Sequence, residues 1–360
     1  FFMHQEPSGV WIMAYTTIDN PGLFFNTVLY TGANKSITGV NFQPDWVWIK
    51  ERDSGYHAIF DSIRGATKIL SSNVTNAEST QSDTLTSFDS DGFTLGADSS
   101  NYVGGSSTST VSWNWLAGTS FSNDASATGI GTIDSSGSVS DAAGFSIVSY
   151  TGNSTSGASI KHGLSSAVKF VVGKAINTSG EDWYTGHASN GFDKYIKLND
   201  THAAQTFSGV FNDTAPNTSI VTLGSNGIIN SSSYNYIMYC FAEKKGYSKF
   251  GSYTGNGNAD GAFVYTGFRP AWVMIKRSSA AQSWILYDNK RSSFNTTNDL
   301  LFANTSGAES ADNSVGIDFL SNGFKCRSAD DSINSGTYIY MAFAEAPFVT
   351  AGTKAAGTAR

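Results

Sequence analysis

The sequence predicts an all-β protein built from three tandem β-sandwich repeats, jelly-roll-like, of about 100 residues each. A repeated motif is the first reason: Tyr-Thr-Gly leads, after a spacer, into an apolar strand that ends in Lys. Composition is the second, since charged residues make up only 14% while Gly occurs 37 times. Ser, Thr and Asn fill most polar positions, which suits strands and turns better than solvated helices. The motif copies are Tyr30-Thr31-Gly32 with 46–50, Tyr150-Thr151-Gly152 with 169–174, and Tyr253-Thr254-Gly255 with 272–276.

The spacing of the motifs sets the expected domain boundaries. Tyr30 and Tyr150 are 120 positions apart, whereas Tyr150 and Tyr253 are 103 apart, and an insertion rich in Ser, Gly, Asp and Ala explains the longer step. Units of this length exceed a solenoid repeat and match a sandwich domain. We expect an N-terminal strand segment at 1–19 that ends an upstream unit or completes another sheet, repeat 1 at 20–118, a linker or exposed hairpin at 119–142, repeat 2 at 143–245, repeat 3 at 246–348, and a flexible C-terminal tail at 349–360.

The strands of each repeat are predicted from short apolar or alternating runs bounded by turn residues. The clearest run has Val111, Trp113 and Trp115 on one face and Ser112 and Asn114 on the other, which indicates a half-buried strand. Repeat 1 is expected to form strands at 26–30, 46–50, 57–63, 93–97 and 110–116. Repeat 2 is expected to form them at 145–150, 168–174, 183–186, 194–198, 219–223 and 234–242. Repeat 3 is expected to form them at 250–253, 263–266, 272–276, 284–288, 316–320, 324–327 and 338–344.

Charge and hydropathy exclude several classes of protein. The net charge is −7 and the basic residues are scattered, so we expect no nucleic-acid partner. No apolar run approaches the roughly 18 residues of a membrane span. The sequence does not begin with Met and shows no signal peptide, so we interpret the N-terminus as incomplete or processed. Cys240 and Cys326 lie within apolar strand patterns and are expected as buried thiols, not as a disulfide framework.

No catalytic motif stands out, so the sequence predicts a protein that is not an enzyme and needs no cofactor. It contains no Gly-x-Ser-x-Gly, His-Glu-x-x-His or Cys-x-x-Cys, and its histidines have no partner at a recognisable spacing. Most acidic residues lie in turns, although a pair of carboxylates placed across strands, as a glycosidase needs, stays open. The run 256–261 resembles the front half of a calcium loop, but Gly267 stands where an EF-hand has its bidentate Glu. A turn is favoured there, and whether any loop binds calcium stays open.

One segment is a candidate ligand surface. Trp183 and Tyr184 lie near His187 and Asn190. An exposed aromatic ring beside amide groups forms a stacking platform for a sugar, because the ring face meets C–H groups while amides bind hydroxyls. The alternative is that these rings belong to the core.

Two charged pairs recur at equivalent places. Asp61 with Arg64 in repeat 1 matches Asp288 with Arg291 in repeat 3. We expect structural ion pairs at strand ends that fix a loop or a subunit contact. The tandem sandwiches could also pack as a pseudo-threefold single chain. That alternative predicts that similar faces from each Trp-rich strand meet at one axis.

Several motifs resemble a repeated domain common in the genomes of marine tailed phages. They are 144–153 with His162-Gly163-Leu164, the runs 242–257 and 266–276, and the closing run 338–348. The resemblance extends over about residues 20–348. It implies a virion structural component, usually a tail fibre or tail-associated protein on the particle surface, with no enzymatic residues to carry over.

The resemblance also implies partners, namely other virion proteins, a homo-oligomer with a trimer favoured for fibres, and a host-surface polysaccharide. A capsid decoration or fibre protein and a glycan-degrading tail enzyme are the alternative functions. Any binding function is expected where the repeats differ, at 71–90, 119–142, 177–193 and 199–218.

Overall fold

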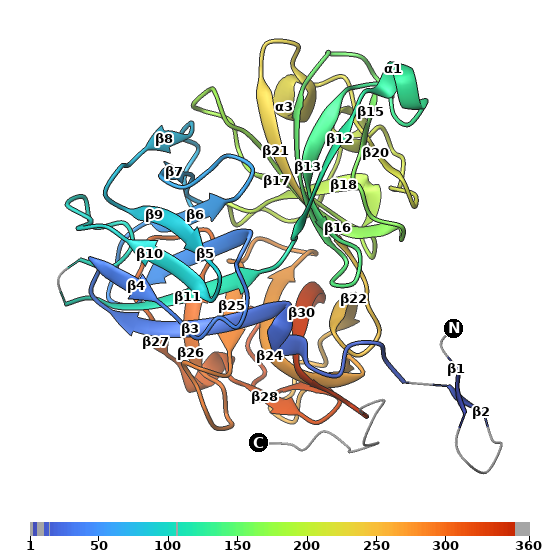
Figure 1. Ribbon diagram of the computed structural model, residues 1–360. Helices are drawn as coiled ribbons and strands as arrows, with labels where there is room; N and C mark the ends of the chain where they lie inside the picture. Colours follow the sequence, from blue (N-terminus) through green and yellow to red (C-terminus); the bar gives the residue numbers. More distant parts are fainter. Residues whose placement is uncertain (1–2, 6–10, 14, 106, 350–360) are drawn as a thin grey trace.

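The computed structural model describes residues 3–5, 11–13, 15–105 and 107–349. Its sheets are antiparallel, and the protein is all-β, as the sequence predicts. Figure 1 shows repeat 1 in blue and cyan, repeat 2 in green and yellow, and repeat 3 in orange and red, gathered around a common centre. The tail expected at 349–360 lies, from residue 350 on, outside the described residues. In the N-terminal segment β1 (Met3–Gln5) pairs with β2 (Trp11–Met13).

The main sheet of every repeat contains the same order of four strands. The first strand carries Tyr-Thr-Gly, the second closes the repeat, and the third carries the apolar run with Lys. In repeat 1 the order is β3 (Phe25–Thr31), β11 (Ser109–Trp115), β5 (Trp46–Glu51) and β6 (His57–Asp61). In repeat 2 it is β14 (Phe145–Thr151), β21 (Asn235–Ala242), β16 (Val168–Ala175) and β17 (Tyr184–His187). In repeat 3 it is β22 (Ser248–Thr254), β30 (Thr337–Pro347), β24 (Phe268–Arg277) and β25 (Ile285–Asp288).

A second, smaller sheet or strand pair packs on one face of each main sheet. Apolar side chains of the two layers form a local core in each repeat, so the architecture is sandwich-like. The small layers are β4 (Lys35–Ile37), β10 (Gly92–Leu95) and β9 (Leu85–Asp89) in repeat 1, β15 (Ser159–Lys161) and β20 (Ile220–Thr222) in repeat 2, and β23 (Phe263–Tyr265), β29 (Gly323–Cys326) and β28 (Ile317–Leu320) in repeat 3.

Short outer elements complete the sheets. In repeat 1, β7 (Lys68–Ile69) pairs with β8 (Ser79–Thr80) beyond β6. At the equivalent place, repeat 2 has β18 (Gly191–Lys197) paired with β19 (Gln205–Thr206), and repeat 3 has β26 (Asp299–Phe302) paired with β27 (Ser310–Ala311). Four of the short helices are α2 (Ser208–Phe211), α3 (Gly227–Asn230), η1 (Pro21–Leu23) and η2 (Asn313–Val315).

The insertion at 119–142, expected as a linker or an exposed hairpin, extends the sheet of repeat 2. It forms β12 (Thr119–Asn123), α1 (Ala125–Thr128) and β13 (Ser135–Ser140), and β13 pairs with β14. The sheet of repeat 2 therefore has eight strands, and β14 has neighbours on both sides. The equivalent strands β3 and β22 are edge strands of their main sheets.

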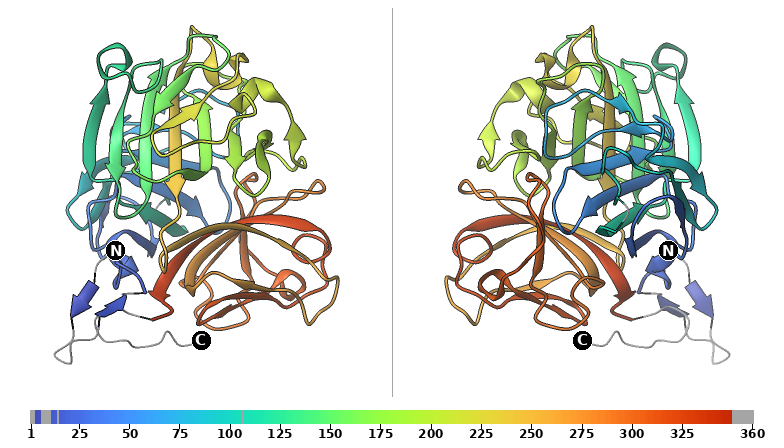
Figure 2. Two further views of the ribbon diagram at one scale, coloured as in Figure 1. Left: turned by 90° about the vertical axis from the view of Figure 1, so that its right-hand side faces the viewer. Right: turned by 90° about the vertical axis from the view of Figure 1, so that its left-hand side faces the viewer.

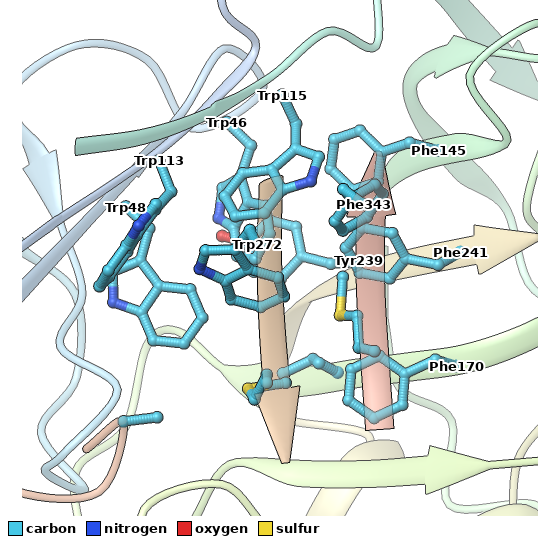
Figure 3. Close-up of a cluster of buried hydrophobic side chains, with 14 of the residues drawn as sticks. Trp46, Trp48, Trp113, Trp115, Phe145, Phe170, Tyr239, Phe241, Trp272 and Phe343 are labelled. Carbon is cyan, nitrogen blue, oxygen red and sulfur yellow. The ribbon is translucent and has the colours of Figure 1, made fainter. Parts of the chain in front are cut away.

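A shared core lies between the three main sheets and is made by all three repeats (Figure 3). Trp46 and Tyr239 stack with ring centroids 4.6 Å apart, and Trp115 meets Trp272 edge to face at 5.7 Å. Phe343 joins the contact, 5.6 Å from Trp115. Burying each large aromatic ring contributes roughly 1.5–3 kcal/mol, so this core is a principal link between the repeats. The similar faces of the Trp-rich strands therefore meet in one place, and Figure 2 shows the three bodies closing on each other.

The Tyr-Thr-Gly motif is a framework element in all three repeats. Its tyrosine hydroxyl donates to the backbone of the loop that precedes the closing strand. At Gly152 a Cβ would lie 2.3 Å from the carbonyl oxygen of Ser231, so the close approach of these loops requires Gly. The hydroxyl contacts are Tyr30 to the carbonyl of Val103 at 2.7 Å, Tyr150 to Ile229 at 2.8 Å, and Tyr253 to Ile333 at 2.6 Å.

Candidate functional site

Three seams join the repeats, and one equivalent contact is present in each. We name them seam 1/2, seam 1/3 and seam 2/3 after the repeats that they join. At each seam a ring N–H at the start of the fourth main-sheet strand, or just before it, donates to a backbone carbonyl of the next repeat. The contacts are Trp183 Nε1 to Ser71 O at 2.9 Å in seam 1/2, His57 Nε2 to Phe302 O at 3.0 Å in seam 1/3, and Trp284 Nε1 to Lys197 O at 2.8 Å in seam 2/3.

These contacts run in one direction around the molecule. Repeat 1 donates to repeat 3, repeat 3 to repeat 2, and repeat 2 to repeat 1. Each seam also contains a backbone hydrogen bond that runs in the opposite direction, and the three bonds lie at equivalent positions of the repeats. These bonds run from Glu78 N to Ile176 O at 2.8 Å, from Ala204 N to Ser278 O at 3.0 Å, and from Glu309 N to Arg52 O at 2.6 Å. The arrangement is therefore cyclic within a single chain.

Both expected ion pairs are present, and each lies at a seam. Asp61 Oδ2 accepts from Arg64 Nε at 2.5 Å and from the hydroxyl of Tyr239 in repeat 2 at 2.8 Å. The two charged side chains are at most 3% exposed. Seam 1/2 thus contains a buried charge pair that binds the neighbouring repeat directly.

Seam 1/3 repeats this chemistry. Asp288 Oδ2 accepts from Arg291 Nε at 2.6 Å and from the indole N–H of Trp113 in repeat 1 at 3.0 Å. Glu309 contacts Arg291 at 3.0 Å and also pairs with Arg52 across the seam. The expected "strand-end" pair is therefore an inter-repeat junction.

In seam 2/3 the position of the ion pair has the same geometry but a neutral side chain. His187 pairs with Phe170 in the ladder, where Asp61 pairs with Trp46 and Asp288 with Trp272. His187 Nε2 donates to the carbonyl of Tyr340 in repeat 3 at 3.2 Å, and its Nδ1 accepts from Ser189 N at 3.1 Å. Burial lowers the pKa of His187 to about 4, so the imidazole is neutral at pH 7.

The lysines that end the apolar strands are buried beside the seams. Lys50, Lys174 and Lys276 are fully buried, and burial lowers the pKa of each to about 8. Lys174 Nζ donates to Thr75 O of repeat 1 at 3.4 Å, and Lys276 Nζ donates to Thr201 O of repeat 2 at 3.0 Å. These ammonium groups therefore hold neighbouring loops through backbone carbonyls.

Of the four residues proposed as a glycan surface, the three with rings are buried. Trp183 is fully buried in the shared core, Tyr184 is 5% exposed in the local core of repeat 2, and His187 is 2% exposed. Asn190 alone is partly exposed. These rings therefore belong to the core, which is the alternative stated for them above. Trp183, His187 and Asn190 have the same spacing as His57, Asp61 and Arg64. The equivalence is present in the sequence, but it is hard to recognise because repeat 2 has no Asp or Arg at these positions.

A polar groove of about 330 Å³ lies on the insertion-bearing side of repeat 2. Ser122, Ser136 and Ser149 line it from directly opposite positions on β12, β13 and β14. Asp124 and Asp134 lie at its α1 end. Sequence reasoning marked 119–142 as a place to look but did not foresee this serine ladder, because strand order is needed to see it.

The carboxylates of the groove have structural partners. Asp124 accepts from Ala127 N at 3.0 Å and caps α1, and Asp134 accepts from Ala125 N at 2.8 Å. Hydrogen bonds from Ser126 and from Ala127 N lower the pKa of Asp124. A general acid needs a raised pKa, so this geometry argues against Asp124 in that role.

The remaining candidates are also engaged in structure. Asn256 and Asn258 accept backbone N–H groups of their own loop at 3.0 Å, and Asp260 pairs with Lys325.

Cys240 and Cys326 are buried free thiols, as predicted, and burial raises the pKa of Cys326 to about 11. Within the described ranges, no group of three or more His, Cys, Asp and Glu side chains is placed to hold a metal ion. None of the helices described is long and apolar enough to cross a membrane.

Comparison with known proteins gives one match. The model of a family described as a domain of unknown function, DUF7483, matches residues 20–347 as a single unit that includes all three main sheets. No curated protein and no solved structure matches the chain. Since the match spans most of its length, the chain belongs to the DUF7483 family.

Proposed function

We propose that the chain is a non-enzymatic structural protein of a phage virion, a tail fibre or tail-associated protein whose three repeats act as one rigid head on the particle surface. The observation that carries the proposal is the cyclic set of seam contacts around a shared core. A closed set of packed junctions resists relative motion of the repeats, which suits a part that transmits or withstands force. The phage assignment itself rests on the sequence resemblance described above.

We also propose that each unit is a jelly-roll-like sandwich of about 100 residues, at 20–118, 143–245 and 246–348. In this arrangement one chain supplies the threefold head that fibres commonly build from three chains. A homotrimer, other virion proteins and a host polysaccharide remain the proposed partners, and the outward loops that differ between repeats would meet them.

Localisation in intact virions by cryo-electron microscopy tests this function. We expect density for the pseudo-threefold head on the tail, at a few copies per particle. Hundreds of copies on the shell would favour the alternative of a capsid decoration protein. Density inside the capsid lumen, or absence of the chain from purified particles, would contradict both.

A further inference from the structure

Repeat 2 departs from the pattern of the other repeats at one outer strand position. Tyr195 pairs with Gln205 where Ile69 pairs with Ser79 and Leu300 with Ser310. Ile69 and Leu300 are 3% and 1% exposed and belong to their local cores, whereas Tyr195 is only partly buried. An aromatic ring with an accessible part thus replaces a buried aliphatic side chain.

Tyr195 lines a pocket of about 190 Å³ near seam 2/3. It packs against Tyr184, with centroids 5.3 Å apart, and meets the edge-on ring of Phe207 at 6.4 Å. These contacts hold the ring in place. The other lining residues are Lys197, His202, Ala203 and Gln205.

The loop that forms one wall of the pocket is fixed by repeat 3. The carbonyl of Thr201 accepts from Lys276 Nζ at 3.0 Å and from Gln282 N at 2.8 Å. Ala204 N donates to Ser278 O at 3.0 Å. A ligand would therefore meet a wall that is ordered before binding, which lowers the entropic cost of association.

Lys197 and His202 at the pocket already contact carboxylates of the protein. Lys197 Nζ lies 2.7 Å from Asp182 Oδ2, and His202 Nδ1 lies 2.7 Å from Asp200 Oδ2. This second contact leaves the Nε2 atom of the largely exposed His202 side chain available to a ligand hydroxyl. An aromatic ring, an imidazole nitrogen and the Gln205 amide are the groups that a neutral sugar uses, while an acidic ligand would find the ammonium of Lys197 already paired with Asp182.

We propose that this pocket binds a neutral hexopyranose unit of a polysaccharide, with the sugar's C–H face against Tyr195 and its hydroxyls on His202 and Gln205. This inference deepens, and rests on, the proposed contact with host-surface glycans. It moves the binding surface from the buried Trp183 and Tyr184 to the neighbouring outer strands.

Binding of neutral trisaccharides to the full chain tests the pocket. Saturation-transfer NMR and calorimetry would be run with maltotriose, cellotriose and mannotriose, and with trigalacturonate as the acidic comparator. Tyr195→Leu installs the residue type of Leu300, and Tyr56→Leu is the matched control because Tyr56 is 49% exposed and lies outside the pocket. His202→Ala tests a hydroxyl contact on an exposed side chain.

We expect millimolar or tighter binding of at least one neutral trisaccharide, unchanged in Tyr56→Leu. Tyr195→Leu should weaken binding about tenfold or more through loss of the stacking face. His202→Ala should weaken it roughly three- to tenfold. If Tyr195→Leu fails to fold, His202→Ala and Gln205→Ala carry the test alone.

Three results would overturn the proposal: no binding of any neutral trisaccharide, binding that ignores the pocket substitutions, or preferential binding of trigalacturonate. Loss of the pocket proposal would leave a virion location intact, and absence from virions would leave measured sugar binding intact. The two failures are therefore distinguishable.

Discussion

Seam 1/3 and seam 2/3 have the same backbone geometry but different chemistry. In seam 1/3 the buried carboxylate of Asp288 accepts from the guanidinium of Arg291 and from the indole N–H of Trp113 in the neighbouring repeat. In seam 2/3 the neutral imidazole of His187 donates to a backbone carbonyl instead. Asn190 and Ala204 stand where the charged repeats have Arg and Glu.

The charged groups are present together in seam 1/3 and are replaced together in seam 2/3. Removing one member of a buried ion pair leaves an uncompensated charge, which costs more than the pair contributes. Repeat 2 lacks the carboxylate, the guanidinium and the second carboxylate together, so no charge is stranded there. The backbone ladder and the shared core keep the seam in place in both forms.

The largest expected effect comes from breaking the charged seam. Asp288→Ala removes the fully buried carboxylate that Arg291 and Trp113 share, and it leaves the buried guanidinium with Glu309 as its remaining carboxylate. We therefore expect a loss of about 3–5 kcal/mol in the free energy of unfolding. His187→Ala at the equivalent position removes neutral hydrogen bonds and the ring contact with Phe170 but leaves no partner charge behind, so it should cost roughly 1–3 kcal/mol. Urea unfolding of both variants measures the difference. Equal losses would show that charge does not distinguish the seams.

Acid should weaken the neutral seam. The folded-state pKa of His187 is lowered to about 4, so its contribution is present above the unfolded pKa of 6.5 and is lost as pH falls toward 4. Between pH 7 and pH 4 this one group should remove on the order of 3 kcal/mol. His57 and His162, with pKa values lowered by burial to about 3 and 4, act in the same direction.

His187→Gln isolates this contribution. Gln cannot be protonated in this range, so the variant should show a shallower loss of stability between pH 6.5 and pH 4 than the parent protein. Subtracting the two curves cancels groups with the opposite sign, such as Glu51, whose pKa burial raises to about 6. Parallel curves would refute the assignment.

Two tyrosines test the inter-repeat hydrogen bond of seam 1/2. Tyr239→Phe deletes only the hydroxyl that donates to Asp61, and a bond to a charged group contributes roughly 1.5–3 kcal/mol. Tyr247→Phe is the control, because none of the described residues accepts from its buried hydroxyl. The control should be neutral or slightly stabilising in thermal unfolding. A comparable loss in both variants would mean that ring packing, not the bond, decides.

The smallest expected change in the free energy of unfolding comes from substituting the outer carboxylates, Glu309 and Glu78. Glu309 pairs with Arg291 and, across the seam, with Arg52, whereas Glu78 pairs with Arg64 and the more exposed Lys68. Glu309→Gln should therefore cost about 1–2 kcal/mol and Glu78→Gln less than about 1 kcal/mol. Chemical unfolding of both variants gives the order, and the reverse order would contradict the seam role of Glu309.

Much of the framework follows from the sequence alone. The threefold motif marks β3, β14 and β22, and local alternation identifies strands such as β11. The matching Asp–Arg pairs mark equivalent strand ends in repeats 1 and 3. What local patterns lack is the partner across the seam, since Tyr239 and Trp113 are more than 150 positions from the carboxylates that they bind.

The residues proposed as a glycan surface also show that local sequence patterns do not reveal contacts between repeats. Trp183 and His187 lie among polar and glycine residues, so their neighbours in sequence suggest exposure. Their burial is produced by a different repeat folding over them, which period-two patterns cannot encode. Tyr195 lies within the strand expected at 194–198, and only the folding of the following loop, with His202 and Ala203, reveals the pocket beside it.

We expect the three repeats to unfold as one cooperative ring rather than as three independent domains, because the shared core and the seam contacts join them. Differential scanning calorimetry of the full chain tests it most directly, with the Tyr239→Phe variant run in parallel. We expect one transition whose calorimetric and van't Hoff enthalpies agree, and a shift of that whole transition in the variant. Separate transitions, with the substitution moving only one of them, would contradict it.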